Sequence, residues 1–205
     1  NGDGTTDYIA GAPYASPAGR SSAGSVYVYS GSDGSLLYQK DGETSGDQFG
    51  LAVASAGDIN GDGRSDFLIG APKYDQPTKA NIGTVYIYSG ADGSILYQLT
   101  GEAARNEFGS ALGGLWDIDG DGKRDFAVGA PLASPNNMQE AGSVYVYSGA
   151  DGKFICRLDG ESGGLPLGKT GDQFGSAIAP AGDVNGDGKP EIIVGAHQYN
   201  TFPLS

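Results

Sequence analysis

The sequence predicts an all-β protein made of β-propeller blades, each a sheet of four antiparallel strands in about 60 residues. The first observation is composition, since the 205 residues include 37 glycines, 12 tyrosines and 10 prolines. Glycine and proline disfavour helices, whereas tyrosine favours strands. The second observation is an internal repeat, because an acidic motif of the type Asp-Ile-Asn-Gly-Asp-Gly recurs along the chain. Its third position lies at Asn1, Asn60, Asp119 and Asn185, with spacings of 59, 59 and 66 residues.

Four short strand candidates recur in each unit, and the second copy shows them in order. The first follows a Phe-Gly pair (residues 49–55), and the second ends in Gly-Ala-Pro (residues 66–72). The third is a Val-Tyr run (residues 83–90), and the fourth follows an Asp-Gly turn (residues 94–101). Because Asp-Gly readily adopts positive φ values, we expect tight hairpins at Asp33, Asp92 and Asp151.

The third strand of each unit predicts how the sheets pack. Valine or isoleucine alternates with tyrosine in this run, so both faces of the sheet are suited to burial. A sheet with two apolar faces needs a neighbour on each side, and a ring of sheets supplies both neighbours. No segment with a strong helical period competes with this prediction.

The repeat also predicts how the chain is divided. We expect one propeller region over 1–205, with a partial repeat at 1–48, repeats at 49–107 and 108–173, and a partial repeat at 174–205. Three to four blades are fewer than a ring needs, and the chain starts inside an acidic loop. We therefore expect further blades outside it, and a ring completed by a second copy of the chain is the alternative.

Charge and cysteine content narrow the class of partner. The chain has 25 acidic and 12 basic residues, a formal net charge of -13, which disfavours nucleic acid as a partner. The excess of carboxylates indicates either a solvated acidic surface or bound divalent cations. Cys156 is the single cysteine, so no disulfide forms within the chain. No apolar run is long enough to cross a membrane, so we expect no membrane insertion by this segment.

The acidic loop at 58–66 has an alternating arrangement of oxygen ligands. Asp58, Asn60, Asp62, the carbonyl of Arg64 and Asp66 stand at positions 1, 3, 5, 7 and 9, a pattern that wraps Ca²⁺. An EF-hand is disfavoured, because its position 12 needs a glutamate and a helix follows it. A catalytic carboxylate cluster is disfavoured as well, since this motif occurs four times at a structural period. The remaining alternative is an Asx-rich turn without a metal.

Together, the Phe-Gly pairs, the acidic loops and the Gly-Ala-Pro segments resemble FG-GAP repeats. These are the units of the seven-bladed propeller of integrin α chains and of many bacterial surface proteins. The resemblance implies a calcium ion in the hairpin loop between the first and second strands of each blade. It implies three complete sites, and a fourth in the first loop, where position 1 is missing. Carried over copy by copy, the further ligands are Asp117, Asp119, Asp121, the Lys123 carbonyl and Asp125; Asp183, Asn185, Asp187, the Lys189 carbonyl and Glu191; and Asn1, Asp3, the Thr5 carbonyl and Asp7.

Strand alternation predicts two different faces. The acidic loops and the Asp-Gly turns share one face, while the loops after Gly-Ala-Pro and before Phe-Gly share the other. The loops after Gly-Ala-Pro have equal lengths and different sequences, which marks either a recognition surface or drift in unconstrained loops. In integrins the ligand face is likewise the one away from the calcium loops. The candidate partner-binding residues are Tyr14, Arg20, Tyr74, Lys79, Asn136 and Lys169.

These features predict a calcium-stabilised, non-enzymatic propeller module for protein recognition or cell adhesion, located outside the cell or at its surface. The alternative is a carbohydrate-binding propeller, or the accessory module of a secreted hydrolase or lyase, so the expected ligand is an extracellular protein or a glycan. Trp116 replaces a glycine of the other copies and either packs on a neighbour or stacks on a sugar. His197 is the only histidine, so a histidine-based catalytic triad is not expected.

Overall fold

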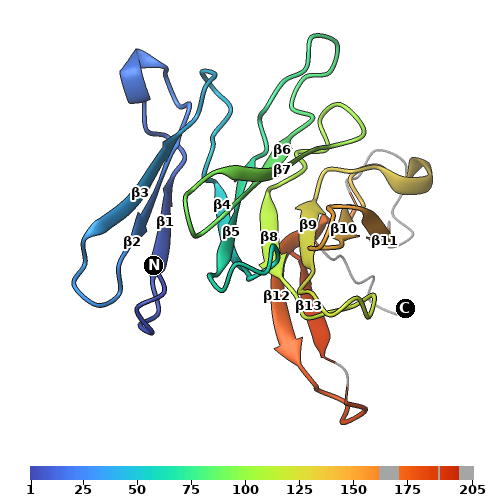
Figure 1. Cartoon of the computed structure of the whole chain (residues 1–205). Coiled ribbons are helices and arrows are strands. Elements are labelled where there is room, and N and C mark those ends of the chain that lie inside the picture. The colour runs from blue at the N-terminus through green and yellow to red at the C-terminus, as the bar shows by residue number, and fades with distance from the viewer. Residues whose placement is uncertain (162–170, 189, 199–205) are drawn as a thin grey trace.

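The computed structural model describes residues 1–161, 171–188 and 190–198. In these residues the chain forms 13 strands in four antiparallel sheets, with two short 3-10 segments (Figure 1). Two sheets have four strands, in the order β4-β5-β6-β7 and β8-β9-β10-β11. The predicted all-β fold with blades of four antiparallel strands is therefore confirmed.

The strands occupy the predicted segments of each repeat. The first sheet contains β1 (Tyr8–Ala12), β2 (Ser25–Tyr29) and β3 (Leu36–Asp41), and the second contains β4 (Ala52–Gly57), β5 (Asp66–Ala71), β6 (Thr84–Tyr88) and β7 (Ile95–Thr100). The third contains β8 (Ala111–Gly114), β9 (Phe126–Ala130), β10 (Ser143–Tyr147) and β11 (Phe154–Asp159), and the fourth contains β12 (Phe174–Gly182) and β13 (Glu191–Ala196). The 3-10 segments η1 (Pro17–Gly19) and η2 (Pro135–Asn137) lie in the loops that follow Gly-Ala-Pro.

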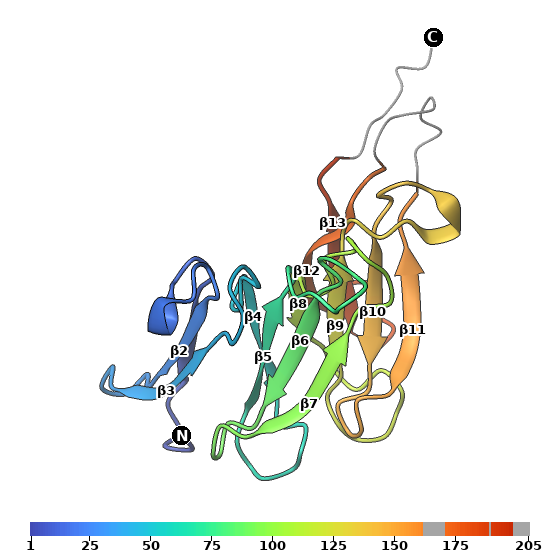
Figure 2. The ribbon, with the colours of Figure 1, turned by 90° about the horizontal axis from the view of Figure 1, so that it is seen from above.

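Successive sheets lie side by side (Figure 2), and residues on their facing surfaces are buried. Val85 and Ile87 of β6 are fully buried, and so is Phe108 at the start of the third repeat. The tyrosine face is also covered: the Phe108 and Tyr145 rings pack edge to face, with centroids 5.5 Å apart. Burial of both sheet faces between neighbouring blades supplies the main apolar stabilisation of this fold.

The Phe-Gly and Gly-Ala-Pro motifs meet each other across the interface between two blades. A Cβ added to Gly70 of the second blade would lie 2.1 Å from the carbonyl oxygen of Gly109 in the third, and Gly11 approaches Gly50 in the same way. Gly109 itself has a φ of 94°, which favours glycine. Both motifs therefore recur because two backbones approach closely at each blade junction.

The connecting loops form two faces, as strand alternation predicts. The loops before Phe-Gly bond to the loops after Gly-Ala-Pro, through Gln48 N–H to the Ser22 carbonyl and Glu107 N–H to the Asn81 carbonyl (3.1 and 3.2 Å). We call this side the variable face. The acidic loops lie on the other side with the Asp-Gly turns, and we call it the loop face.

The Asp-Gly turns differ in detail from the expected hairpin geometry. Only the glycine takes a positive φ, as in Gly93 at 70°. The aspartate instead accepts a hydrogen bond from the backbone N–H two residues later, as Asp92 does from Ser94 (2.8 Å). The turn is thus fixed by an Asx hydrogen bond together with one left-handed glycine.

Candidate metal centres

Each acidic loop wraps its backbone around the aspartate at position 1. Asp58 accepts hydrogen bonds from the N–H groups of Gly61, Asp62 and Gly63 (2.7, 3.1 and 2.9 Å). Asp117 and Asp183 make the same three bonds in the third and fourth loops. Glycine at positions 4 and 6 permits this wrapping, because both glycines take φ values near 80°.

The aspartate at position 9 anchors the loop to the sheet. Asp66 and Asp125 are buried at the entrance to β5 and β9, with exposed fractions of 1% and 0%. Asp66 accepts from the N–H groups of Ile59, Asn60 and Gly90 (3.0, 3.3 and 2.9 Å). Burial raises the pKa of both carboxyls, and their backbone hydrogen bonds oppose that rise. A cation beside these carboxylates would stabilise their charged forms.

The Ser-Gly pair after each Val-Tyr run also belongs to the site, a role that sequence reasoning missed. The hydroxyl of Ser89 donates to Asp62 (3.3 Å), and Ser148 donates to Asp121 (3.2 Å). The following Gly149 donates its N–H to Asp125 (3.1 Å). The signal was present in the sequence, because Ser-Gly recurs in all three copies of the run.

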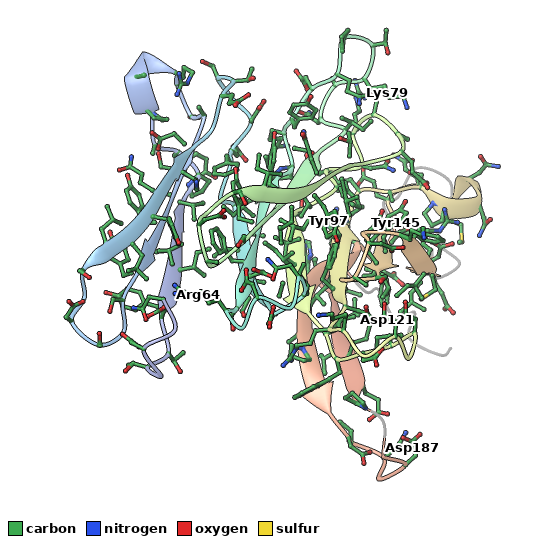
Figure 3. The ribbon with its side chains drawn as sticks, in the orientation of Figure 1. Arg64, Lys79, Tyr97, Asp121, Tyr145 and Asp187 are labelled. Carbon is green, nitrogen blue, oxygen red and sulfur yellow. The ribbon has the colours of Figure 1, made fainter. Side chains whose placement is uncertain are left out.

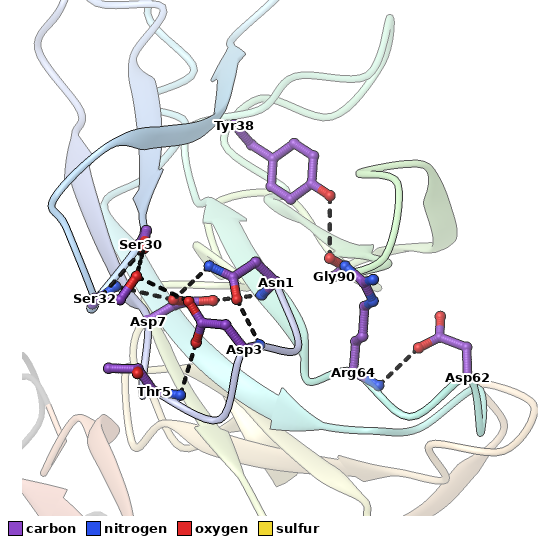
Figure 4. A network of polar contacts seen from close by, with 11 residues as sticks. Asn1, Asp3, Thr5, Asp7, Ser30, Ser32, Tyr38, Asp62, Arg64 and Gly90 are labelled. Atoms are coloured by element: carbon purple, nitrogen blue, oxygen red, sulfur yellow. Dashed lines mark hydrogen bonds and ion pairs between the residues drawn. The ribbon is translucent and has the colours of Figure 1, made fainter.

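The first loop (Figure 4) has no residue at position 1 and keeps one contact of the Ser-Gly pair: the Gly31 N–H donates to Asp7 (3.0 Å), as Gly90 does to Asp66. Asp3 accepts from the Thr5 N–H (2.8 Å), and the Ser32 hydroxyl donates to Asp3 (2.9 Å). The hydroxyl that meets Asp3 thus comes from Ser32 in the Asp-Gly turn, and not from Ser30, the counterpart of Ser89.

Two of the loops gather three acidic side chains each. Asp117, Asp119 and Asp125 bring carboxylate oxygens within 4.8 Å of one another, and so do Asp183, Asp187 and Glu191. Ligands on opposite sides of Ca²⁺ are separated by about 5 Å, twice the Ca–O distance, so both groups fit one ion. Asp121 and Asp187 mark these loops in Figure 3. Among the described residues, the first and second loops do not form such a group.

The position 7 residues, whose carbonyls are expected as ligands, direct their side chains to the preceding blade. Arg64 lies against Gly2 of the first loop, and Lys123 lies against Gly61 of the second. Lys189 lies outside the described residues.

The candidate partner-binding residues lie in the loops of the variable face, but several make contacts within the chain. Tyr14 is 68% exposed, and Asn136 is exposed with a φ of 52° in η2. Arg20 donates to the Gly42 carbonyl (3.1 Å), and Lys79, labelled in Figure 3, donates to the Glu102 carbonyl (2.7 Å). Tyr74 packs on the core between the first two sheets, and Lys169 lies outside the described residues.

Sheets of four antiparallel strands, each with an acidic hairpin loop between its first two strands, define a propeller built from loop-bearing repeats. The FG-GAP repeat profile matches residues 49–88, 108–147 and 174–203, which is more than half of the chain. The chain therefore belongs to the FG-GAP repeat family, and the sequence-based resemblance is confirmed.

Curated relatives include integrin α chains that match nearly the whole chain. It is 36% identical to integrin alpha-4 of Xenopus laevis over 203 residues, covering 93% of this chain and 18% of the relative. It is 35% identical to human integrin alpha-IIb and 32% identical to chicken integrin alpha-V, covering 96% and 100% of this chain. The chain spans about a fifth of the length of these relatives, 19% and 20% for the last two.

Solved structures share the fold at low sequence identity. Rhamnogalacturonan lyase YesX superposes with a TM-score of 0.58 at 17% identity, covering 96% of this chain and 37% of the lyase. Rhamnogalacturonan lyase YesW gives 0.55 at 18% identity, covering 95% and 38%. This likeness shows the fold alone. A search of the described residues finds no helix long and apolar enough to span a membrane.

Proposed function

We propose that this chain is a calcium-stabilised extracellular module that recognises a protein ligand in cell adhesion. The observation that carries the proposal is the separation of the two faces. The repeated acidic loops occupy the loop face, where they tie each blade together, and the loops that differ between repeats occupy the variable face. The similarity to integrin α chains supports the same assignment and an extracellular or cell-surface location.

Calcium would have a structural role in this proposal. The residues that would hold it are those at positions 1, 3, 5, 7 and 9 of the acidic loops, in three complete sites and a fourth in the first loop. A bound divalent cation would neutralise part of the net charge of -13 and would close each hairpin. Removing it with EDTA should lower the melting temperature by about 10 °C or more, whereas an unchanged melting temperature would contradict a structural metal.

The chain would act by binding and not by catalysis. The carboxylates of the loop face are engaged by backbone N–H groups and repeat from blade to blade, which suits a scaffold better than a unique active site. Turnover of esters, phosphates or glycans by the isolated chain would overturn this part of the proposal.

Recognition through the variable face can be tested by cell attachment. Surfaces coated with the chain should retain cells in calcium, and the double variant Tyr14→Ala/Asn136→Ala should retain fewer. Both side chains are exposed, and Ala18 of the first repeat already occupies the place of Asn136 with a φ of 51°, so the fold should tolerate the change. Lys153→Ala on the loop face, 81% exposed, is the matched control and should attach cells normally. Equal attachment by the double variant and the unchanged chain would argue against the variable face as the binding surface.

A further inference from the structure

The third repeat departs from the other copies at two positions that contact each other. The Arg124 guanidinium lies over the Trp116 indole, with Cζ 4.2 Å from the ring centroid, in a cation–π arrangement. Neither residue follows the repeat. The other copies have Gly57 and Gly182 in place of Trp116, and Thr6, Ser65 and Pro190 in place of Arg124. The scaffold therefore does not require this pair.

The Arg124 side chain is held in one direction. Its Nε donates to the Leu115 carbonyl at 3.2 Å, and its stem lies against Gly57 at the end of β4. A Cβ at position 57 would collide with Arg124 Cδ, so glycine leaves the space that the side chain occupies. Trp116 covers one face of the guanidinium plane. Contacts on both sides thus fix where the terminal nitrogens of Arg124 lie.

Arg124 lines a hollow of about 440 Å³ at the loop-face end of the innermost strands. Figure 2 shows β4, β8 and β12 in succession, and each contributes to the lining. The walls combine hydroxyls, from Ser55 and Ser65, with apolar surface from Ile178 and Pro180. Ser55 accepts the Gly57 N–H (3.3 Å), which leaves its hydroxyl proton free to donate.

The charge of Arg124 is not matched by a carboxylate in the part of the chain that the structure describes. Lys73, Lys153 and Arg157 each pair with an acidic side chain, whereas no ion pair of Arg124 occurs among the described residues. In a chain with 25 acidic and 12 basic residues, a fixed guanidinium without such a partner offers a site for an external anion. Its planar fork matches a carboxylate in geometry.

We propose that this hollow binds a uronic acid unit of an acidic saccharide, with Arg124 on the carboxylate. One guanidinium suits one negative charge, and a polyanion such as nucleic acid would be repelled by the net charge of -13. Ser55 and Ser65 suit the sugar hydroxyls, and the Ile178 and Pro180 surface suits the face of the ring. This site lies apart from the variable face and does not depend on protein recognition there.

Trp116 makes the site directly observable, because it is the only tryptophan of the chain. Titration with galacturonic or glucuronic acid disaccharides should change its fluorescence, whereas the uncharged galactose and glucose disaccharides should not. Arg124→Ser, which places the residue of the second repeat at this position, should weaken uronate binding about tenfold or more. Trp116→Gly should also weaken uronate binding, measured by calorimetry, because Arg124 loses the indole that stacks on its guanidinium. Lys153→Ala, which removes a cation of the loop face outside this hollow, should bind uronate normally.

Several outcomes would overturn the proposal. They are equal binding of acidic and neutral sugars, unchanged uronate affinity in Arg124→Ser, and no uronate binding up to about 10 mM. Binding that requires calcium and survives Arg124→Ser would place the carboxylate on a metal ion instead. Tighter binding of an acidic peptide than of any uronate would make the ligand a protein. The comparison of acidic with neutral sugars uses the unchanged chain, so it holds even if a variant fails to fold.

Discussion

Asp47 provides a prediction about the pH dependence of stability. Its carboxyl should favour the folded state at low pH, the reverse of a carboxyl whose pKa is lowered by folding. Asp47 precedes a Phe-Gly pair on the variable face and is 7% exposed. Burial raises the pKa of its carboxyl to about 6, and the nearby Asp75 adds to the rise, while Thr44 opposes it. The folded protein holds this proton more tightly than the unfolded chain does. The contribution of the Asp47 carboxyl to the free energy of unfolding is therefore fully present below about pH 4. It is lost as pH rises through about 6.

The perturbation is Asp47→Asn, and the third repeat already has Asn106 at the same place. A rise of about two pKa units corresponds to at most about 3 kcal/mol at neutral pH. Asp47→Asn should therefore increase the free energy of unfolding by about 1–3 kcal/mol at pH 7, and the gain should shrink towards pH 4.

Urea unfolding of both proteins across this pH range, at constant calcium, measures the difference directly. Asn106→Asp is the reverse change and should destabilise the protein at neutral pH. A difference between Asp47→Asn and the unchanged chain that stays constant with pH would refute the reasoning, as would a loss of stability at pH 7.

Three further predictions concern the blade junctions and the acidic loops. Gly70→Ala should lower the free energy of unfolding by more than about 2 kcal/mol in urea denaturation, because its Cβ would overlap the Gly109 backbone. Ser45→Ala, at an exposed site, is the control. Equal stability of the two variants would argue against a close approach of the two backbones. Ser148→Ala should lower the free energy of unfolding by about 1 kcal/mol in thermal unfolding, since Asp121 loses a hydrogen bond. An unchanged melting temperature would show that this hydroxyl does not stabilise the loop. Asp117→Asn should remove one equivalent of bound calcium in calorimetry, whereas Asn1→Ala should leave the three complete sites intact. An unchanged calcium stoichiometry in Asp117→Asn would contradict the role of Asp117 as a ligand.

Much of the fold follows from local sequence because the repeat presents each strand several times. The alternation of valine or isoleucine with tyrosine predicted burial of both sheet faces, and Val85 and Tyr145 are indeed buried. Period and strand type are local properties of the chain, so one sequence was enough to predict them.

Contacts between distant segments were harder to predict. Ser89 joins Asp62 across 27 residues, and Gly70 meets Gly109 across a blade junction, so neither contact follows from one repeat considered alone. The burial of Asp47 depends on how two loops dock, which its sequence neighbourhood does not reveal. Trp116 was visible as a departure from the repeat, but only the structure shows that Arg124 stacks on it.

Isothermal titration of calcium into the metal-free chain tests the central claim most directly, because it counts the ions that the acidic loops bind. Calcium should bind with three equivalents per chain, at 58–66, 117–125 and 183–191, and with a weaker fourth at the incomplete first loop. Binding of less than one equivalent would contradict the claim that these loops are metal centres, and would leave them as Asx-rich turns held by their own hydrogen bonds.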